Sequence, residues 1–339
     1  MSNLLLKLIF KNTICINLLE YFSIIDLYNL YYATAYSSLS VLLLPNLKYI
    51  TIDCINIFEL YHLISTSIIK KLLILVIKFN INVNMIKFEN IDHMTNLIEL
   101  VNLLFKIQAK SISIDQFAIN AFVNSNLHNI VEYLEFIGYR GKYLEYPTIS
   151  RFPVCNKLKK IKISYSNMVL SLANIHLLLS SAPNIKELTL LGGVLSISMI
   201  LSNFIFYKVT HLILENILIF DLNILKIKFP NLIYLMINNC ICLDYIDQVV
   251  HLPEMLEELI IYDNDCEDGN GDGNGDGNED DNEDGNILLL INIPKLTYLK
   301  KLKIGGTTRI ILNMISMLKK EEYIQQLPQC LSVEYNTFA

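Results

Sequence analysis

Several residue types that would point to particular chemistry are scarce or absent in this chain of 339 residues. It has no Trp, and its seven cysteines form no C-x-x-C pair. The cysteines stand at positions 15, 54, 155, 240, 242, 266 and 330. An odd number at irregular spacings argues against a disulfide framework and favours a reducing, intracellular compartment, where Cys serves as a small apolar residue.

Groupings that bind metals or carry out catalysis are also missing from the sequence. The six histidines are dispersed at positions 62, 93, 128, 176, 211 and 251, and none lies beside a Cys or carboxylate cluster at zinc-ligand spacing. Outside one low-complexity tract there is no phosphate-cradling glycine loop and no Cys/His/Asp grouping. We therefore predict that the protein is not an enzyme and needs no metal and no cofactor.

A strong excess of charge of either sign is absent from most of the chain. The net charge is −6, but eleven acidic residues and no basic residue fall within the segment 263–286. The rest of the chain has 22 acidic against 27 basic residues. Because this excess is small and scattered, we predict no binding to nucleic acid.

The chain is apolar enough for a membrane span to be considered. Apolar residues make up 53% of it, and the mean hydropathy is +0.41. The 20 residues 188–207 carry no charge, which is about the length that crosses a bilayer. They contain a Gly-Gly pair and several Ser and Asn, however, and the repeat described next accounts for them as strand, turn and helix. The N-terminus, interrupted by Lys7 and Lys11, is a poor signal peptide. We predict no membrane association.

A repeated pattern, L-x-x-L-x-L, dominates the chain. Self-similarity at a period of 20 to 50 residues indicates a repeat architecture. The copies are Leu72-Leu75-Ile77, Val131-Leu134-Phe136, Leu158-Ile161-Ile163, Ile185-Leu188-Leu190, Val209-Leu212-Leu214, Leu232-Leu235-Ile237, Leu256-Leu259-Ile261 and Leu299-Leu302-Ile304. Weaker copies begin at Leu47, Ala109 and Pro328. This spacing is typical of leucine-rich repeats, in which each copy contributes one short strand.

The segments between the copies are typical of helices and turns. Ile197, Ile200, Leu201, Phe204 and Ile205 fall on one face of a helix. Three copies, ending at Asn80, Cys240 and Asn264, have the polar residue with which a leucine-rich repeat turns away from its strand. We therefore predict an α/β solenoid over 45–339, with parallel strands on its concave face and helices or irregular segments on its convex face.

An acidic tract, 263–286, interrupts this repeat. The step of 43 residues between Leu256 and Leu299 exceeds the preceding step of 24 by 19. Residues Asp268, Asn270, Asp272, Gly273 and Glu279 match the calcium-loop pattern D-x-[DN]-x-[DN]-G-x5-E. A low-complexity tract rich in D, G and N matches such a pattern in more than one register, and a strand precedes it instead of a helix. We interpret the tract as a disordered insertion; calcium binding is the alternative.

The segment before the repeats resembles an F-box. The family runs roughly I-[LF]-x-[YF]-L-x-x-x-[DE]-L-x-x-[LA]. Its places are filled by Leu18, Leu19, Tyr21, Phe22, Asp26, Leu27 and Leu30. The family's Leu-Pro element should fall on residues 10–14, where only the apolar first and last positions match. Followed by leucine-rich repeats, this segment makes the chain similar to F-box/leucine-rich-repeat proteins. The alternative is that 1–44 is only the N-terminal cap of the solenoid.

This resemblance implies a function. An F-box docks on a Skp-family adaptor that bridges to a cullin, and the repeats then present an unknown protein substrate for ubiquitin transfer. The adaptor would contact Leu18, Leu19, Phe22, Asp26, Leu27 and Leu30. The alternative is a stand-alone interaction scaffold without a role in ubiquitin transfer. The residue bias suits an A+T-rich genome such as that of a large DNA virus, which predicts the host cytoplasm, or the nucleus, as its location.

The concave face is the predicted site of the substrate. Side chains alternate along a strand, so the variable positions of the repeat point onto that face. The residues that we select there are Lys159, Lys160, Lys162, Tyr165, Tyr234, Glu257, Glu258, Tyr262, Lys300 and Lys301. Two rungs of lysine would flank an acidic and aromatic centre, which suits a mixed-charge partner with tyrosine anchors. The plainer interpretation is that these residues are only solvated strand faces.

Overall fold

The fold is seen in a computed structural model. It describes residue 25 and residues 51–88, 97–104, 106–107, 109–115, 118–124, 127–137, 151–164, 172–192, 197–201, 204–219, 222–242, 251–262, 296–306 and 331–337. Except for Ile25, the F-box-like segment 1–44 lies outside the described residues, and so does the acidic insertion 263–286. The predictions made for these two segments stay predictions.

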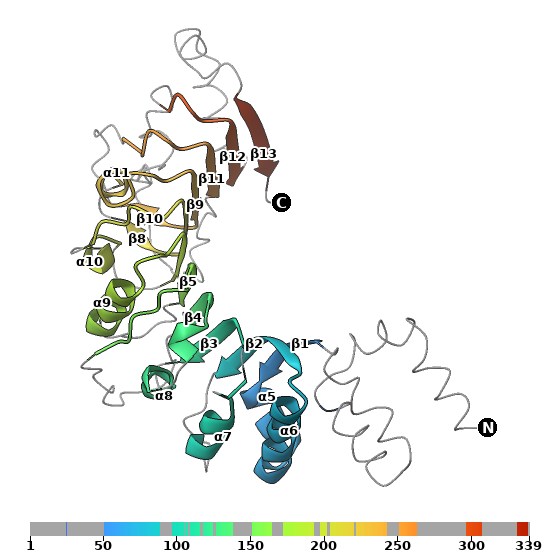
Figure 1. The fold of residues 1–339 in the computed structure, drawn as a ribbon. Coiled ribbons are helices and arrows are strands. Elements are labelled where there is room, and N and C mark those ends of the chain that lie inside the picture. Colours follow the sequence, from blue (N-terminus) through green and yellow to red (C-terminus); the bar gives the residue numbers. More distant parts are fainter. Residues whose placement is uncertain are drawn as a thin grey trace, which may run out of the picture. The chain divides into compact units, whose positions relative to one another are not determined.

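The chain forms two compact units. The N-terminal unit extends to Ile161 and includes Leu177–Asn184, and the C-terminal unit comprises Lys162–His176 and Ile185–Ala339. The N-terminal unit contains β1 (Thr51–Asn56), α5 (Ile57–Leu63), α6 (Thr66–Lys78), β2 (Asn82–Phe88), α7 (Leu97–Leu104), β3 (Ser111–Asp115), α8 (Ile119–Val123), a 3-10 turn (Leu127–Asn129) and β4 (Tyr133–Ile137) (Figure 1). Two of the unit boundaries fall within β5 (Lys160–Ser164) and α9 (Leu172–Ser181), and the third precedes Ile185.

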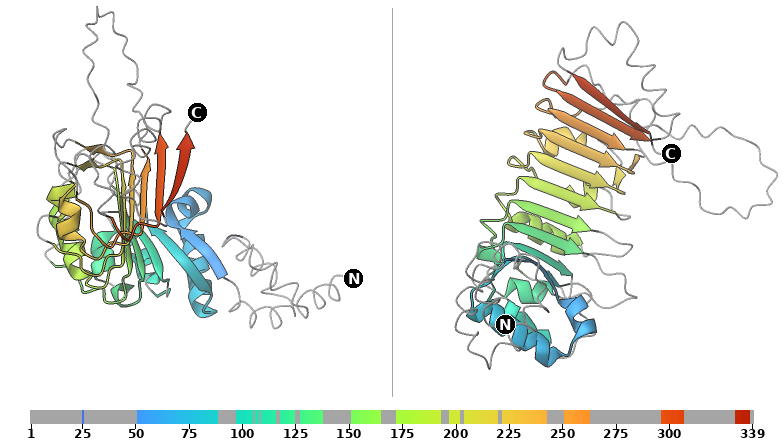
Figure 2. Two further views of the ribbon diagram at one scale, coloured as in Figure 1. Left: turned by 90° about the horizontal axis from the view of Figure 1, so that it is seen from above. Right: turned by 90° about the vertical axis from the view of Figure 1, so that its right-hand side faces the viewer.

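The C-terminal unit alternates short strands with helices or irregular segments. Its elements are β6 (Glu187–Leu191), α10 (Ile197–Leu201), β7 (His211–Glu215), β8 (Leu218–Ile219), α11 (Ile224–Lys228), β9 (Tyr234–Asn238), β10 (Ile241–Cys242), β11 (Glu258–Tyr262), β12 (Lys301–Gly306) and β13 (Ser332–Thr337). Figure 2 shows its main strands side by side with their arrows pointing the same way.

Strand order follows chain order. The larger sheet runs β1-β2-β3-β4-β5-β6-β7-β9-β11-β12-β13, and β8 pairs with β10 in a second, two-stranded sheet. The strand pairs whose register is described are all parallel. Parallel neighbours in chain order are what a stack of strand-containing repeats produces. The coarse prediction of an α/β repeat fold with a parallel sheet is therefore confirmed.

Equivalent aliphatic residues of successive repeats lie next to one another in the core. In the N-terminal unit, Ile55, Ile86, Ile112 and Leu134 are in register and completely buried. The same row in the C-terminal unit consists of Leu188, Leu212, Leu235, Leu259 and Leu302. A single strand of five residues could not bury such side chains alone, so the repeats must stack to form the core.

The backbone joins consecutive repeats in the same way at the start of several described strands. The carbonyl of Lys186 accepts hydrogen bonds from the N–H groups of Thr210 and His211, at 2.9 and 3.1 Å. The carbonyl of Thr210 in turn accepts from Ile233 and Tyr234. The carbonyls of Lys110, Glu132, Ile233 and Glu257 each accept from two successive N–H groups of the next repeat. This recurrence shows that the repeats share one geometry as well as one sequence pattern.

An Asn that directly follows Pro adds a side-chain hydrogen bond between consecutive repeats. Asn184 Nδ2 donates to the carbonyl of Asn156 at 2.7 Å in the N-terminal unit. Asn231 Nδ2 makes the equivalent bond to the carbonyl of Tyr207 at 2.8 Å in the C-terminal unit. In both repeats the Asn directly precedes the first aliphatic residue of the pattern. The Pro-Asn pairs therefore mark where one repeat is fastened to the repeat before it.

One predicted strand is a helix. The pattern copy Leu72-Leu75-Ile77 lies within α6, where Leu72 and Leu75 belong to a buried helical face together with Ile69. Asn80 follows the helix in a left-handed conformation, with φ of 49°. The N–H groups of Asn80 and Ile81 donate to the carbonyls of Ile77 and Val76, which is the usual bonding of a helix C-terminus. The prediction failed because residues three apart share a face on a helix as well.

Two other copies were predicted in the wrong register. Ile52 pairs with Val83 and Ile55 with Ile86, so the first described copy begins at Ile52, not at Leu47. The strand β2, which carries the copy Val83-Ile86-Phe88, was not predicted. At the other end, Val333 pairs with Leu302, which places that copy two residues later than predicted. The copy beginning at Ala109 is confirmed by β3.

The uncharged stretch 188–207 forms a strand and a short helix. Residues up to Leu191 belong to β6, Gly192 has φ of 67°, and α10 spans Ile197–Leu201. The helix ends before Phe204, so the predicted helical face is confirmed only for its first three residues. No helix in the described part of the chain is long and apolar enough to cross a membrane.

Candidate protein-binding face of the sheet

The C-terminal unit presents a regular set of side chains opposite its buried rows. Because side chains alternate along a strand, the residues between the buried aliphatics point to the other face of the sheet, which we call the open face. It comprises Glu187, Thr189, Leu191, His211, Ile213, Glu215, Tyr234, Met236, Asn238, Glu258, Ile260, Tyr262, Lys301, Lys303, Ser332 and Glu334. Neighbouring strands in a sheet lie about 4.8 Å apart, so residues in register across them are close neighbours.

An apolar row crosses the middle of the open face. Ile213, Met236 and Ile260 occupy the same position in β7, β9 and β11 and are in register. Ile213 and Met236 are half-buried, whereas Ile260 is 7% exposed. The Tyr234 hydroxyl donates to Met236 Sδ at 3.8 Å. A partner that covered this row would remove partly exposed apolar surface from water, which favours association.

Aromatic rings border the apolar row. The rings of His211 and Tyr234 are stacked, with centroids 5.5 Å apart and an interplanar angle of 24°. Burial raises the pKa of Tyr234, and the nearby Glu258 and Tyr262 raise it further, against the opposing effect of Lys303. The Tyr234 hydroxyl therefore stays protonated at neutral pH and can donate a hydrogen bond to a partner. Tyrosine suits such a site because its ring and its hydroxyl serve both apolar and polar contacts.

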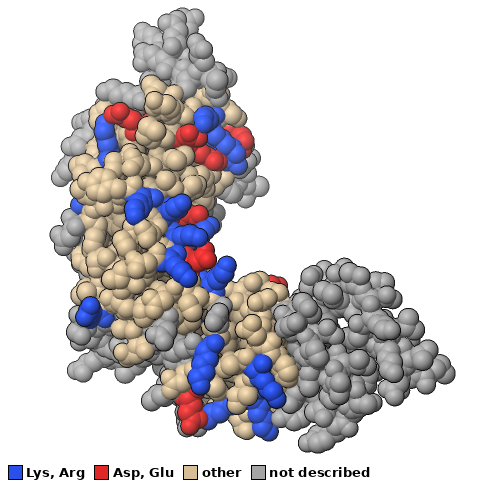
Figure 3. Space-filling model, viewed as in Figure 1, with Lys and Arg blue, Asp and Glu red and all other residues tan. Residues whose placement is uncertain are grey.

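Lysines on the last strands of the open face are paired with acids. Lys301 lies 3.5 Å from carboxylate oxygens of both Glu258 and Glu334. Lys303 Nζ lies 3.1 Å from Glu334, and the hydrogen bond to that carboxylate is the main reason why the pKa of Lys303 is raised. The pKa of Glu334 is lowered, chiefly by Lys303. Figure 3 shows red and blue atoms interleaved around β12 and β13.

The same pairing occurs just before these strands begin. Lys300 Nζ lies 2.7 Å from a carboxylate oxygen of Glu257 on the neighbouring repeat. The lysines that the sequence placed together at the end of the repeats therefore do not form an uncompensated positive rung. Sequence reasoning noted Glu257 and Glu258 but missed Glu334, because the copy containing β13 was read in the wrong register.

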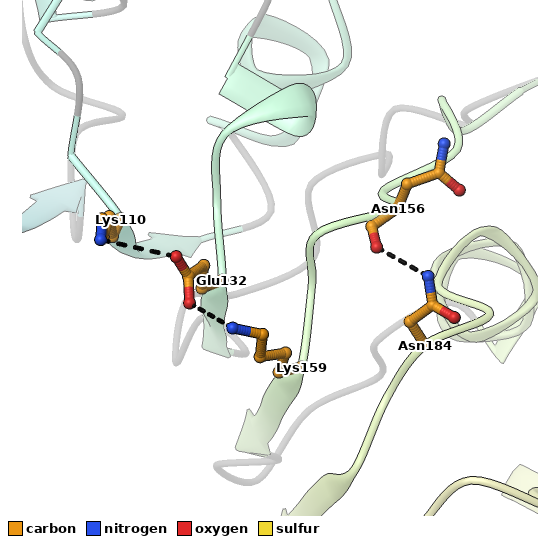
Figure 4. A network of polar contacts seen from close by, with 5 residues as sticks. All are labelled: Lys110, Glu132, Asn156, Lys159 and Asn184. Atoms are coloured by element: carbon orange, nitrogen blue, oxygen red, sulfur yellow. Dashed lines mark hydrogen bonds and ion pairs between the residues drawn. The ribbon is translucent and has the colours of Figure 1, made fainter.

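The remaining predicted lysines lie near the start of β5. Lys159 Nζ lies 2.7 Å from Glu132, whose other carboxylate oxygen is 3.6 Å from Lys110 (Figure 4). The hydrogen bond and charge of Lys159 lower the pKa of Glu132. Lys160 is exposed and Lys162 is half-buried. Lys159 and Lys160 belong to the N-terminal unit and Lys162 to the C-terminal unit, and Tyr165 lies outside the described residues.

Of the ten predicted partner-binding residues, four lie on the strands β9, β11 and β12 of the C-terminal unit, and two more directly precede β11 and β12. Tyr234, Glu258 and Lys301 are consecutive in register across β9, β11 and β12. Tyr262 lies on the same face at the end of β11, and Glu257 and Lys300, directly before β11 and β12, pair with each other. The sequence missed Ile213 and Ile260, although their places between buried aliphatics in the pattern could have revealed them.

Left-handed residues end three strands of the C-terminal unit. Gly192, Asn216 and Asn239 stand two residues after the last aliphatic of their repeats and have φ of 67°, 54° and 47°. Each donates its backbone N–H to a carbonyl at the end of the next strand. Asn239 Nδ2 also donates to Asn216 Oδ1 at 2.5 Å. The sequence placed the polar turn residue one position later, at Cys240, which is instead buried.

Comparison with known proteins does not identify a family. No protein-family model and no curated protein matches the chain. Among the described residues, no three His, Cys, Asp or Glu side chains gather as they would to hold a metal ion. The open face, with its apolar row and charged border, is the feature of the described residues from which a function can be argued.

Proposed function

We propose that the protein is a substrate-recognition subunit of a ubiquitin ligase built from a Skp-family adaptor, a cullin and an F-box protein. The segment 1–44 would bind the adaptor through Leu18, Leu19, Phe22, Asp26, Leu27 and Leu30. The open face of the C-terminal unit would bind the protein substrate. The chain itself would carry out no chemistry, and its contribution would be to raise the effective concentration of the substrate near the ubiquitin-loading enzyme.

The observation that carries the binding half of this proposal is the apolar row Ile213-Met236-Ile260 between tyrosines. Binding sites on proteins typically combine apolar and aromatic side chains at the centre with charges at the rim. The open face has this arrangement, because Tyr234 and Tyr262 border the row and the ion pairs of β12 and β13 lie to one side of it. The adaptor half rests on the F-box resemblance of the sequence.

A catalytic cysteine within the repeats is disfavoured at Cys155, one of the described cysteines. Burial raises the pKa of the Cys155 thiol to about 11. Its Sγ lies 3.4 Å from the carbonyl oxygen of Pro153, to which the thiol donates. Nucleophilic attack requires the thiolate, so a protonated and buried thiol supports a structural role for this residue.

The decisive experiment is a binding assay between the full chain and a purified Skp-family adaptor. We expect the wild-type chain to retain the adaptor and the double substitution Asp26→Lys with Leu27→Lys to lose it. The matched control is Met236→Lys on the open face, which should retain the adaptor. Urea unfolding of each variant checks that the repeats remain folded.

The same assay addresses the alternative, a stand-alone interaction scaffold. A wild-type chain that fails to bind any adaptor offered, while its open face still binds a partner, would contradict the ubiquitin-ligase role and favour the scaffold. Adaptor binding that survives the Asp26 and Leu27 substitutions would show that the F-box-like segment is not the docking element.

A further inference from the structure

The four strands β6, β7, β9 and β11 give the open face a negative and apolar character. Their open-face positions include Glu187, Glu215 and Glu258 and contain no Lys or Arg. Outside these four strands, lysine occurs on β12, where Lys301 pairs with Glu258, and on β5, which carries Lys162. The part of the open face that holds the apolar row therefore lacks basic residues of its own.

The surroundings of Glu215 favour pairing with a basic residue of a partner. It is half-buried and stands on β7 two residues after Ile213. Its neighbours in register are Leu191 on β6 and Asn238 on β9, so neither adjacent strand offers it a cation. A half-buried carboxylate beside apolar side chains loses part of its hydration, which costs free energy. A cation from a partner would compensate for that cost.

Glu215 and the apolar row are close enough for one short peptide segment of a partner to contact both. Residues two apart on a strand of a parallel sheet are separated by about 6.6 Å, and adjacent strands by about 4.8 Å. A single short segment can therefore place one side chain on Ile213 and Met236 and a neighbouring one against Glu215. Lys and Arg suit the second position, because their aliphatic stems pack on apolar residues such as Leu191 while the charged group reaches the carboxylate.

We propose that the open face binds a protein segment that combines a large apolar side chain with a nearby Lys or Arg. The apolar side chain packs on Ile213 and Met236 beside the ring of Tyr234. The basic side chain pairs with Glu215. This inference rests on the proposed role of the open face as the substrate site and names the class of substrate that it selects.

The test is selection of peptides from a randomised 12-residue display library on the immobilised full-length chain. We expect peptides selected on the wild type to contain a Lys or Arg close to a large apolar residue. These peptides should bind Glu215→Lys at least tenfold more weakly. Selection on Glu215→Lys should instead yield Asp or Glu near the apolar residue, because the substitution reverses the charge that the partner must match.

Two further variants make the result specific. Met236→Ala should weaken the same peptides without changing their preference for a basic residue, since it removes only apolar contact. Glu254→Lys is the matched control, because Glu254 is an exposed acid outside the open face that pairs with Lys226 at 2.8 Å. It should bind the selected peptides as the wild type does. Unfolding midpoints confirm that each variant is folded.

Three outcomes would overturn the inference: no enriched peptides, enriched peptides without a basic residue, or basic peptides that bind Glu215→Lys as tightly as the wild type. The outcome is separate from that of the adaptor assay. Adaptor binding without basic peptides would remove only this substrate class. Basic peptides without adaptor binding would leave the open face as the site of a scaffold protein.

Discussion

Residues with positive φ end successive strands of the C-terminal unit in the same way. Asn239 adopts φ of 47° after β9 and bonds to Asn216, whereas Asn238 immediately before it lies within the strand. A β-branched side chain is strained in the left-handed region but is favoured in a strand. The same substitution should therefore act differently at these two neighbouring positions.

We expect Asn239→Val to lower the free energy of unfolding by about 1–2 kcal/mol, which is the cost of forcing such a residue into this conformation. Asn238→Val is the control and should change stability by about 0.5 kcal/mol or less, as substitutions on a strand face usually do. Urea denaturation of both variants measures the difference. Equal losses at 238 and 239 would contradict the role given to the left-handed turn.

A second prediction at this scale concerns Tyr133 on β4. Burial, followed by the charge of Glu135 and a hydrogen bond to it, raises the pKa of Tyr133 from 10 to about 12. A raised pKa means that the folded state favours the neutral phenol. The corresponding stability is fully present below pH 10, where the unfolded chain is also neutral, and is lost as the pH rises toward 12.

Urea unfolding measured from pH 9 to pH 11.5 tests this. We expect the wild type to lose stability more steeply over this range than Tyr133→Phe, because the variant has no phenol to ionise there. The comparison uses the slope with pH, so any constant effect of the missing hydroxyl cancels. Parallel curves for the two proteins would show that Tyr133 does not have a raised pKa.

The sequence predicted which residues share the open face, but it did not predict all of their ion pairs. The sequence indicated Tyr234, Tyr262, Glu258 and Lys301 as members of one face, and their positions on the strands agree. It could not show that Lys301 is compensated by Glu334, because ion pairs across strands depend on register, which the sequence pattern had placed two residues away. The register of a strand is set by its pattern of buried side chains and by the connection before it, and the degenerate copy at residues 328–333 was too irregular to fix it.

At the scale of elements, alternation along a strand separates stability from binding. On β7, Leu212 is completely buried in the aliphatic row, whereas Ile213 is half-buried on the open face. We expect Leu212→Ala to cost about 2–5 kcal/mol of folding free energy, as is usual for a buried Leu. Ile213→Ala should cost only about 1 kcal/mol.

Thermal or urea unfolding of the two variants measures this difference in stability. Binding of the selected peptides should show the opposite order of effects. Ile213→Ala should weaken peptide binding, and Leu212→Ala should not do so under conditions where it is folded. If both substitutions destabilise the fold equally, β7 does not have one buried and one open face.

Elements were predicted well where the repeat is regular and poorly where it is not. The strands β4 to β12 that start from a clear L-x-x-L-x-L copy were placed correctly. The pattern failed at the copy beginning at Leu72 because α6 is a 13-residue helix rich in Ile and Leu, in which the same spacing arises from helical periodicity. Length distinguishes the two cases, since apolar residues at helical spacing over the 13 residues of α6 favour a helix over a strand.

At the scale of the whole molecule, the acidic insertion leaves the strands around it in register. Leu259 on β11 pairs with Leu302 on β12 although 43 residues separate them, and Leu259 pairs with Leu235 across the ordinary step of 24. The described pairing of β11 with β12 thus resembles that between repeats without an insertion. Loop closure costs little more for a longer loop, which explains how the insertion is tolerated.

We expect deletion of residues 265–285 to leave the unfolding midpoint and the circular dichroism spectrum of the protein nearly unchanged. Isothermal titration of the intact chain with Ca²⁺ should show no binding in the micromolar range. Loss of the cooperative unfolding transition on deletion, or micromolar Ca²⁺ binding by the intact chain, would show that the tract is a structural or metal-binding element.

The joint between repeats has a consequence for how such a chain can change in length. Directly before six of the described strands, one main-chain carbonyl accepts from two amides of the next repeat, and this arrangement does not depend on side-chain identity. Gaining or losing one whole copy of 23 or 24 residues would therefore recreate the same junction on either side. Unequal recombination within the gene could thus add or remove one repeat at a time without requiring a new contact between repeats. Each such step would change the area of the sheet that a partner can cover.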